Sequence, residues 1–272
     1  DDGCEWKSRT VSSRTACLGV QEGPAAIWYQ LLMPDGHRLH CVAVLLRQGR
    51  PARETELIEA IQSGDVGRAV TLAREEPTLS RAKADSGASA LLLSVYYGRR
   101  EVTQAFIDAG AELDIFEASA TGNLERVREL LDAQPGLLDA FSADGFFPLG
   151  LAVFFGHREI VTELLRRGAS VHSVARNKQR VTALHAAVTK RDSETARALL
   201  EKGADANARQ ESDYTPLHVS AARGDVESTQ LLLSHGADTS AKASDGKTPL
   251  DLARENGQAE TARMLEKAGG SA

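Results

Sequence analysis

Two histidines are the residues of this chain that could most readily do chemistry, because imidazole can transfer protons and bind metal ions near neutral pH. His185 and His218 lie 33 residues apart, and each ends the same four-residue pattern, T-x-L-H. The corresponding position holds Gly150 in FPLG and Asp251 in TPLD. A catalytic or metal-binding role shared by this position would not allow glycine there, so the spacing indicates a structural role.

A second candidate lies near the N-terminus, where the run HRLHC places His37 and His40 beside Cys41. These side chains can bind zinc, but no second cluster of ligands accompanies them, so we predict no metal site. The chain also lacks a G-x-S-x-G element, a phosphate-binding loop and a dinucleotide-binding fingerprint. We therefore expect a protein that is not an enzyme and that uses no cofactor.

Composition changes at about residue 50. The first 41 residues contain every cysteine and tryptophan of the chain, namely Cys4, Cys17, Cys41, Trp6 and Trp28. The apolar runs of this segment, AAIWYQLLM and CVAVLL, are short and scattered. We expect residues 1–52 to be a disordered or spurious leader, and residues 53–272 to form one domain.

The charge pattern argues against two classes of partner. The formal net charge is −6, with acidic and basic residues mixed along the chain, whereas a nucleic-acid or membrane-surface binder should show a clear basic footprint. No apolar run is long enough to span a bilayer. We expect a monomer that binds neither nucleic acid nor membrane and that is cytoplasmic or, alternatively, a secreted effector acting on a host protein.

The elements that must position these side chains follow a repeat. TALH (182–185), TPLH (215–218) and TPLD (248–251) succeed one another every 33 residues. In TPLHVSAARGDVESTQLLLSHGADTSAKASDGK (215–247), Thr215 can cap a helix and Pro216 suits its first turn. Gly224 can end that helix with a positive φ. A second helix, DVESTQLLLSH, and a polar turn with Asp-Gly complete the unit.

This unit resembles the ankyrin repeat, which has a period of 33 residues and the signature T-P-L-H-x-A. The resemblance covers about residues 53–269 and implies an all-α ankyrin-repeat solenoid of about seven helix-turn-helix repeats with short β-hairpin fingers. We expect the helix pairs to start near 54, 88, 115, 146, 181, 214 and 247, with polar terminal repeats as caps. The runs AREEPTLSRA and LDAQPGLLDA resemble bacterial members of the family.

Two connections depart from the repeat. Between Gly110 and Gly122 the chain is nine residues shorter than in the regular repeats, which predicts a gap in the row of fingers. The connection before TALH, which contains SVARNKQR, is two residues longer and strongly basic, so we expect an oversized basic finger there.

The resemblance also implies where a partner binds, because the family uses the groove formed by the finger tips and the ends of the first helices. Six of the eleven Phe and Tyr residues fall at such positions, although the chain is only 5% aromatic. Basic residues lie on the neighbouring repeats. The predicted partner-binding residues are Tyr96, Tyr97, Phe146, Phe154, Phe155, Arg176, Lys178, Arg180, Lys190, Tyr214 and Arg223.

Aromatic anchors beside cations suit an acidic, partly apolar peptide or protein face, so we predict a protein-protein interaction module. Three alternatives stay open. The rings could pack on one another and fill the groove floor in a structural spacer. The aromatic cluster could instead receive a small ligand, which would need a closed pocket rather than an open trough. Any single Lys or Arg could simply be solvated.

Overall fold

The computed structural model describes residues 10–12, 15–22, 27–32, 38–44 and 52–269. The chain falls into two units, Asp1–Thr55 and Glu56–Ala272. The sequence places the corresponding boundary between residues 52 and 53.

The first unit contains a four-stranded antiparallel sheet in the order β1-β2-β3-β4. Its strands are β1 (Thr10–Ser12), β2 (Thr15–Glu22), β3 (Ile27–Leu32) and β4 (Arg38–Val44). Cys17 pairs with Leu31, and Ile27 pairs with Val44. No regular element is predicted here from the sequence, yet the run AAIWYQLLM contains β3 and CVAVLL overlaps β4. Strand formation depends on cross-strand neighbours, which a short apolar run does not reveal.

The candidate zinc ligands of HRLHC fall in this region. His40 and Cys41 lie in β4, whereas His37 lies outside the described residues.

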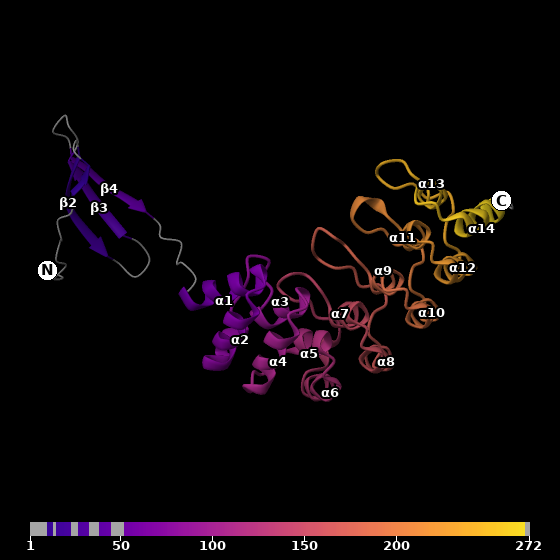
Figure 1. The fold of residues 1–272 in the computed structure, drawn as a ribbon, viewed down its shortest axis with the longest axis horizontal. Helices are drawn as coiled ribbons and strands as arrows, with labels where there is room; N and C mark the ends of the chain where they lie inside the picture. The colour runs from indigo at the N-terminus through magenta and orange to yellow at the C-terminus, as the bar shows by residue number, and fades with distance from the viewer. Residues whose placement is uncertain (1–9, 13–14, 23–26, 33–37, 45–51, 270–272) are drawn as a thin grey trace. The chain divides into compact units, whose positions relative to one another are not determined.

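The second unit is built from pairs of short helices, drawn in Figure 1 from indigo to yellow. The helices are α1 (Ala52–Ser63), α2 (Val66–Glu75), α3 (Ala90–Tyr96), α4 (Arg100–Asp108), α5 (Ile115–Thr121), α6 (Leu124–Ala133), α7 (Pro148–Phe155), α8 (Arg158–Arg166), α9 (Ala183–Thr189), α10 (Ser193–Glu201), α11 (Pro216–Arg223), α12 (Val226–Ser234), α13 (Pro249–Glu255) and α14 (Ala259–Gly269). Three 3-10 turns, Pro77–Arg81, Pro135–Asp139 and Glu211–Asp213, lie in the connections.

The helices stack in two rows. From α3 to α13 each odd-numbered helix packs on the next odd-numbered one, and even-numbered helices pack on one another in the pairs α2 and α4, α6 and α8, α10 and α12, and α12 and α14. One continuous apolar core lies between the rows, from Leu57 in α1 to Leu265 in α14. The prediction of an all-α solenoid is confirmed for residues 52–269.

His185 and His218 hold successive repeats together. Each imidazole is fully buried, and its Nδ1 accepts a hydrogen bond from the hydroxyl of the threonine that caps the same helix, at 2.9 Å for Thr182 and 2.8 Å for Thr215. The Nε2–H of His185 donates to the Tyr214 carbonyl of the following repeat at 3.2 Å. Burial lowers the pKa of His185 to about 4, so this imidazole is neutral at pH 7. The structural role predicted for both histidines is confirmed.

The FPLG repeat replaces both members of this pair. Phe147 stands where the three following repeats have Thr182, Thr215 and Thr248, and its side chain forms no cap hydrogen bond. Gly150 stands in place of histidine, and a Cβ there would lie only 2.9 Å from Cζ of Phe147. The phenyl ring therefore fills the space of the imidazole, and Phe147 is 2% exposed.

The short connection between α4 and α5, which lacks nine residues, is held in place by the carboxyl group of Glu117. Asp114 caps α5, and Glu117 accepts a hydrogen bond from the Asp114 backbone N–H at 3.0 Å. The other oxygen of Glu117 accepts from the Ser89 hydroxyl at 2.6 Å, which ties α5 to α3. Burial, and then the nearby Asp114 carboxylate, raise the pKa of Glu117.

The finger that the sequence predicts to be missing is absent between α4 and α5, but the row of fingers is not left open there. The connecting loop at 82–90 lies against the loop at 141–147, since a Cβ added to Gly87 would be 3.1 Å from Ala143. Further along the row, the Arg176 N–H donates to the Gly145 carbonyl, and the Glu211 N–H donates to the Gln179 carbonyl. Because the α4–α5 connection has no projecting loop, the two flanking loops meet over α5.

Candidate binding groove

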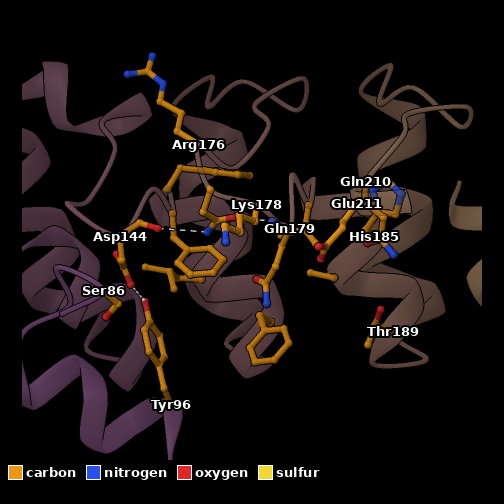
Figure 2. A pocket seen from close by; sticks show the side chains of 18 of the residues that line it. Ser86, Tyr96, Asp144, Arg176, Lys178, Gln179, His185, Thr189, Gln210 and Glu211 are labelled. Atoms are coloured by element: carbon orange, nitrogen blue, oxygen red, sulfur yellow. Dashed lines mark hydrogen bonds between the residues drawn. The ribbon is translucent and has the colours of Figure 1, made fainter. Parts of the chain in front are cut away.

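An open groove of about 1460 Å³ runs along the loop side of α3, α7 and α9. Its floor comes from α3, α7 and α9, with Gln62 of α1. Its wall comes from four connecting loops, which contribute lining residues within 84–86, 143–147, 176–182 and 210–214. Figure 2 shows side chains of these loops and helices around the shared space. Since the groove is open and exceeds the usual volume of a small-molecule pocket, roughly 300–1,000 Å³, its shape favours an extended ligand.

Five rings form what we call the aromatic patch, Tyr96, Tyr97, Phe146, Phe154 and Phe155. The Tyr96 ring is stacked on Phe155 with centroids 6.1 Å apart and meets Phe146 edge-on at 5.9 Å. Phe154 and Phe155 meet at 5.1 Å and 86°. Tyr96, Phe146 and Phe155 are partly buried on a small apolar cluster of Ala88, Leu92, Ala120 and Leu151. Tyr96 and Phe155 therefore belong to the groove floor, and Phe146 packs beside them from the connecting loop.

The other two rings of the patch face solvent. Tyr97 is 46% exposed and Phe154 is 45% exposed, and with Val174 they are the exposed large apolar side chains among the described residues. Successive helix residues point about 100° apart, so Phe155 can pack on the floor while Phe154 cannot. In each adjacent pair, Tyr96–Tyr97 and Phe154–Phe155, one ring is packed on the groove floor and the other is exposed to solvent.

Asp144 holds the floor of the patch in place. Its carboxylate accepts hydrogen bonds from the Tyr96 hydroxyl at 2.8 Å and from the Ser142 hydroxyl, and its carbonyl accepts from the Asn177 side chain at 3.1 Å. Figure 2 shows Tyr96 pointing at Asp144 from across the groove. Burial and Asp144 raise the pKa of Tyr96, so its hydroxyl keeps its proton and remains a donor.

The predicted basic residues take different positions. Lys178 lines the groove, and the Lys190 ammonium lies 5.0 Å above the Phe154 ring. The Arg176 side chain points away from the groove, with its guanidinium carbon 3.8 Å from the centroid of Phe141. Arg180 and Arg223 are exposed and lie outside the lining.

Tyr214 also lines the groove, at the far end from α3. Its ring lies 5.4 Å from the His218 ring, at an interplanar angle of 59°. The backbone carbonyl of Tyr214 accepts the His185 hydrogen bond, so this residue also contributes to the contact between repeats.

Several polar lining residues were missed from the sequence, namely Gln62, Asp85, Ser86, Asp144, Gln179, Gln210 and Glu211. Gln62 could have been found, because it stands two residues before Gly64, as Tyr96 stands before Gly98 and Phe154 before Gly156. The loop residues have no repeated spacing that would mark them. Three of the missed residues are acidic, so the groove carries both signs of charge.

The groove lining combines aromatic rings with charged and polar side chains, which suits it to binding. Within the described ranges, no group of three or more His, Cys, Asp or Glu side chains could hold a metal ion. Over that same part of the chain, no helix combines the length and the apolar character needed to cross a membrane.

Comparison with known proteins identifies the repeats. Residues 115–210 match a family model described as ankyrin repeats (3 copies), and residues 199–253 match one described as ankyrin repeats (many copies). Together the two matches span residues 115–253, just over half of the chain. No curated protein matches the chain in sequence.

Proposed function

Because the chain belongs to the ankyrin repeat family, whose members are generally protein-protein interaction modules, we propose that it binds a segment of another protein in the groove along α3, α7 and α9. The bacterial type and a cytoplasmic or secreted location stay predictions from the sequence.

The observation that carries this proposal is the exposure of Tyr97 and Phe154 inside an open groove. Leaving a large apolar side chain in water forgoes roughly 1.5–3 kcal/mol of burial free energy. Exposed apolar surface next to a hollow usually marks a place where a partner binds. Phe154 is held by Phe155, and Phe155 by Tyr96, so little conformational entropy would be lost when a partner covers the patch.

The partner should have apolar side chains that cover Tyr97 and Phe154, together with acidic residues. Lys190 lies over Phe154 and Lys178 lines the wall, and neither side chain forms an ion pair within the described ranges. A carboxylate on the partner could pair with either ammonium while an apolar neighbour contacts the ring. Asp85, Asp144 and Glu211 also line the groove, so the partner's carboxylates should pair with the two ammonium groups and keep away from these acidic side chains.

The test is affinity capture with the full chain as bait and mass spectrometry as readout, repeated with Tyr97→Ser and Phe154→Ser combined. Both side chains are exposed, so the variant should keep its circular dichroism spectrum and its melting temperature. Phe155 is left unchanged because it packs on the groove floor. We expect a set of captured proteins that the variant no longer retains.

A matched control removes two apolar side chains from the other row of helices. Leu130 in α6 and Leu233 in α12 are partly buried and lie outside the groove lining, and both are changed to Ser. The control bait should retain the partners. If the Tyr97 and Phe154 variant retains the same proteins as the unchanged chain, the groove is not the binding surface.

A further inference from the structure

The connecting loops turn at one equivalent position, two residues before the cap of the following helix. Five residues occupy it, Gly87, Gly145, Arg180, Asp213 and Gly246. All five have a positive φ, between 51° at Arg180 and 90° at Gly87. This left-handed conformation is free of strain for glycine and unfavourable for a residue with a long side chain.

The other non-glycine residues with a positive φ have side chains that either make a structural contact or are small. Asp213 accepts a hydrogen bond from the Ser244 hydroxyl at 2.8 Å, and aspartate tolerates the left-handed region. Arg191, which ends α9 at φ 55°, donates to the Arg223 carbonyl of the next repeat. Ser212, with φ 60°, is small and shares the turn of Asp213.

Arg180 has no such compensation. Its backbone N–H donates to the Asn177 carbonyl at 3.3 Å, but its exposed side chain makes no hydrogen bond, ion pair or ring contact within the part of the chain that the structure describes. Backbone strain at a residue whose side chain makes no stabilising contact in the folded chain indicates a functional role, such as contact with a partner.

The loop around Arg180 is held firmly. In the basic loop, residues 174–182, the Gln179 carbonyl accepts from the Glu211 N–H at 2.9 Å, and the Arg176 N–H donates to the Gly145 carbonyl at 2.8 Å. Val174 and Thr182 form an antiparallel bridge at its base. A guanidinium on such a loop is positioned before binding, which reduces the entropy lost when it pairs with an anion.

We propose that Arg180 is a specificity residue that binds a carboxylate on an acidic segment of the protein partner, next to Lys178, and that it is retained at the expense of stability. This proposal rests on the proposed function of the groove. It adds that the basic loop selects partners with acidic residues. Arg180 itself lies outside the groove lining, and Asp144 and Glu211, which line the groove, form no ion pair with the cations of the basic loop within the described ranges.

The experiment selects short random peptides displayed on phage against the full chain and measures the winners by fluorescence anisotropy. We expect peptides with Asp or Glu beside Leu, Phe or another apolar residue. Arg180→Gly should bind such a peptide about two- to fivefold more weakly, the range for an exposed ion pair. It should also melt about 1–3 °C higher, because glycine relieves the left-handed strain.

Two controls separate this role from general electrostatics and from loop geometry. Arg197→Gln removes one exposed charge from α10, and Arg191→Gly relieves a left-handed arginine whose side chain has a structural contact. Both should leave peptide affinity unchanged, and Arg191→Gly should not gain stability, since it loses the hydrogen bond to Arg223.

The outcomes distinguish this inference from the groove proposal. If no peptide is selected, or if selected peptides do not respond to the combined Tyr97 and Phe154 change, both proposals fail. If peptides respond to the aromatic change but show no enrichment in acids, or bind Arg180→Gly unchanged, only the role of Arg180 is overturned. Equal weakening by Arg197→Gln, or equal binding of a single-stranded oligonucleotide, would reduce Arg180 to non-specific attraction.

Discussion

In α9 and α11 the fourth residue from the helix cap is a histidine that bridges to the next repeat, whereas in α5 and α7 the same position holds Glu117 and Gly150. The imidazoles reach forward to a carbonyl of the following repeat. Glu117 reaches back to Ser89, and Gly150 makes room for the ring of Phe147. The regular half of the array is thus joined by one repeated hydrogen bond, and the half beneath the aromatic patch by two unrelated contacts.

The difference has a consequence for the groove. Three rings of the aromatic patch, Tyr96, Phe146 and Phe155, pack on Ala88, Leu92, Ala120 and Leu151, so the packed part of the patch lies in this irregular half of the array. The loops at 82–90 and 141–147 also meet there, which brings Asp144 within hydrogen-bonding distance of Tyr96. The irregular contacts between repeats and the aromatic patch therefore lie in the same part of the array.

The largest expected effect comes from Phe147. Truncation of this buried ring, Phe147→Ala, should lower the free energy of unfolding by about 3–5 kcal/mol, as for other buried phenylalanines. Urea titration followed by circular dichroism measures it. The combined change Phe147→Thr and Gly150→His restores the regular pair and should destabilise far less than Phe147→Thr alone. Equal losses for the single and double variants would show that the two positions are not coupled.

The next effect is a pH dependence of the regular half. The pKa of His185 is about 4 in the folded protein and about 6.5 when unfolded, so its stabilising contribution is complete above pH 6.5 and declines as pH falls toward 4. Between pH 7 and pH 5 the loss should be about 2 kcal/mol. Burial also lowers the pKa of His218, which acts in the same direction.

Thermal unfolding at a series of pH values tests this, with His185→Gln as the comparison. The variant should be less stable at pH 7 and should show a shallower decline between pH 7 and pH 5. A decline as steep as that of the unchanged chain would mean that other groups cause the acid sensitivity.

The smallest expected effect is a pH dependence of stability with the opposite sign, and it comes from Glu117 in the half beneath the aromatic patch. Because the pKa of Glu117 is raised in the folded state, its ionisation weakens the fold as pH rises. Glutamine can still accept from the Asp114 N–H and can donate to Ser89, so Glu117→Gln should be as stable as the unchanged chain or slightly more so at pH 7. The gain should vanish in acid. Hydrogen exchange of the α3 and α5 amides at both pH values would show it, and a marked loss at pH 7 would contradict it.

The sequence by itself determined the repeat architecture of residues 52–269. The threonine, proline and glycine positions that set each helix start and end act through local backbone geometry, which a spacing of 33 residues displays directly. Eight of the eleven residues predicted for the partner site contribute to the groove lining, because the same spacing places helix ends and connecting loops one after another along one side. Arg176 is one of the eight, although its guanidinium packs on Phe141.

Only the tertiary structure decided which of those residues are free. Whether Phe154 or Phe155 faces solvent, and whether Arg176 turns to the groove or to Phe141, depends on neighbours that come from other repeats. The closing of the finger row over α5, and the strands of the first unit, likewise depend on contacts between segments distant in sequence. A repeat pattern fixes the local backbone, but packing between repeats sets what each side chain touches.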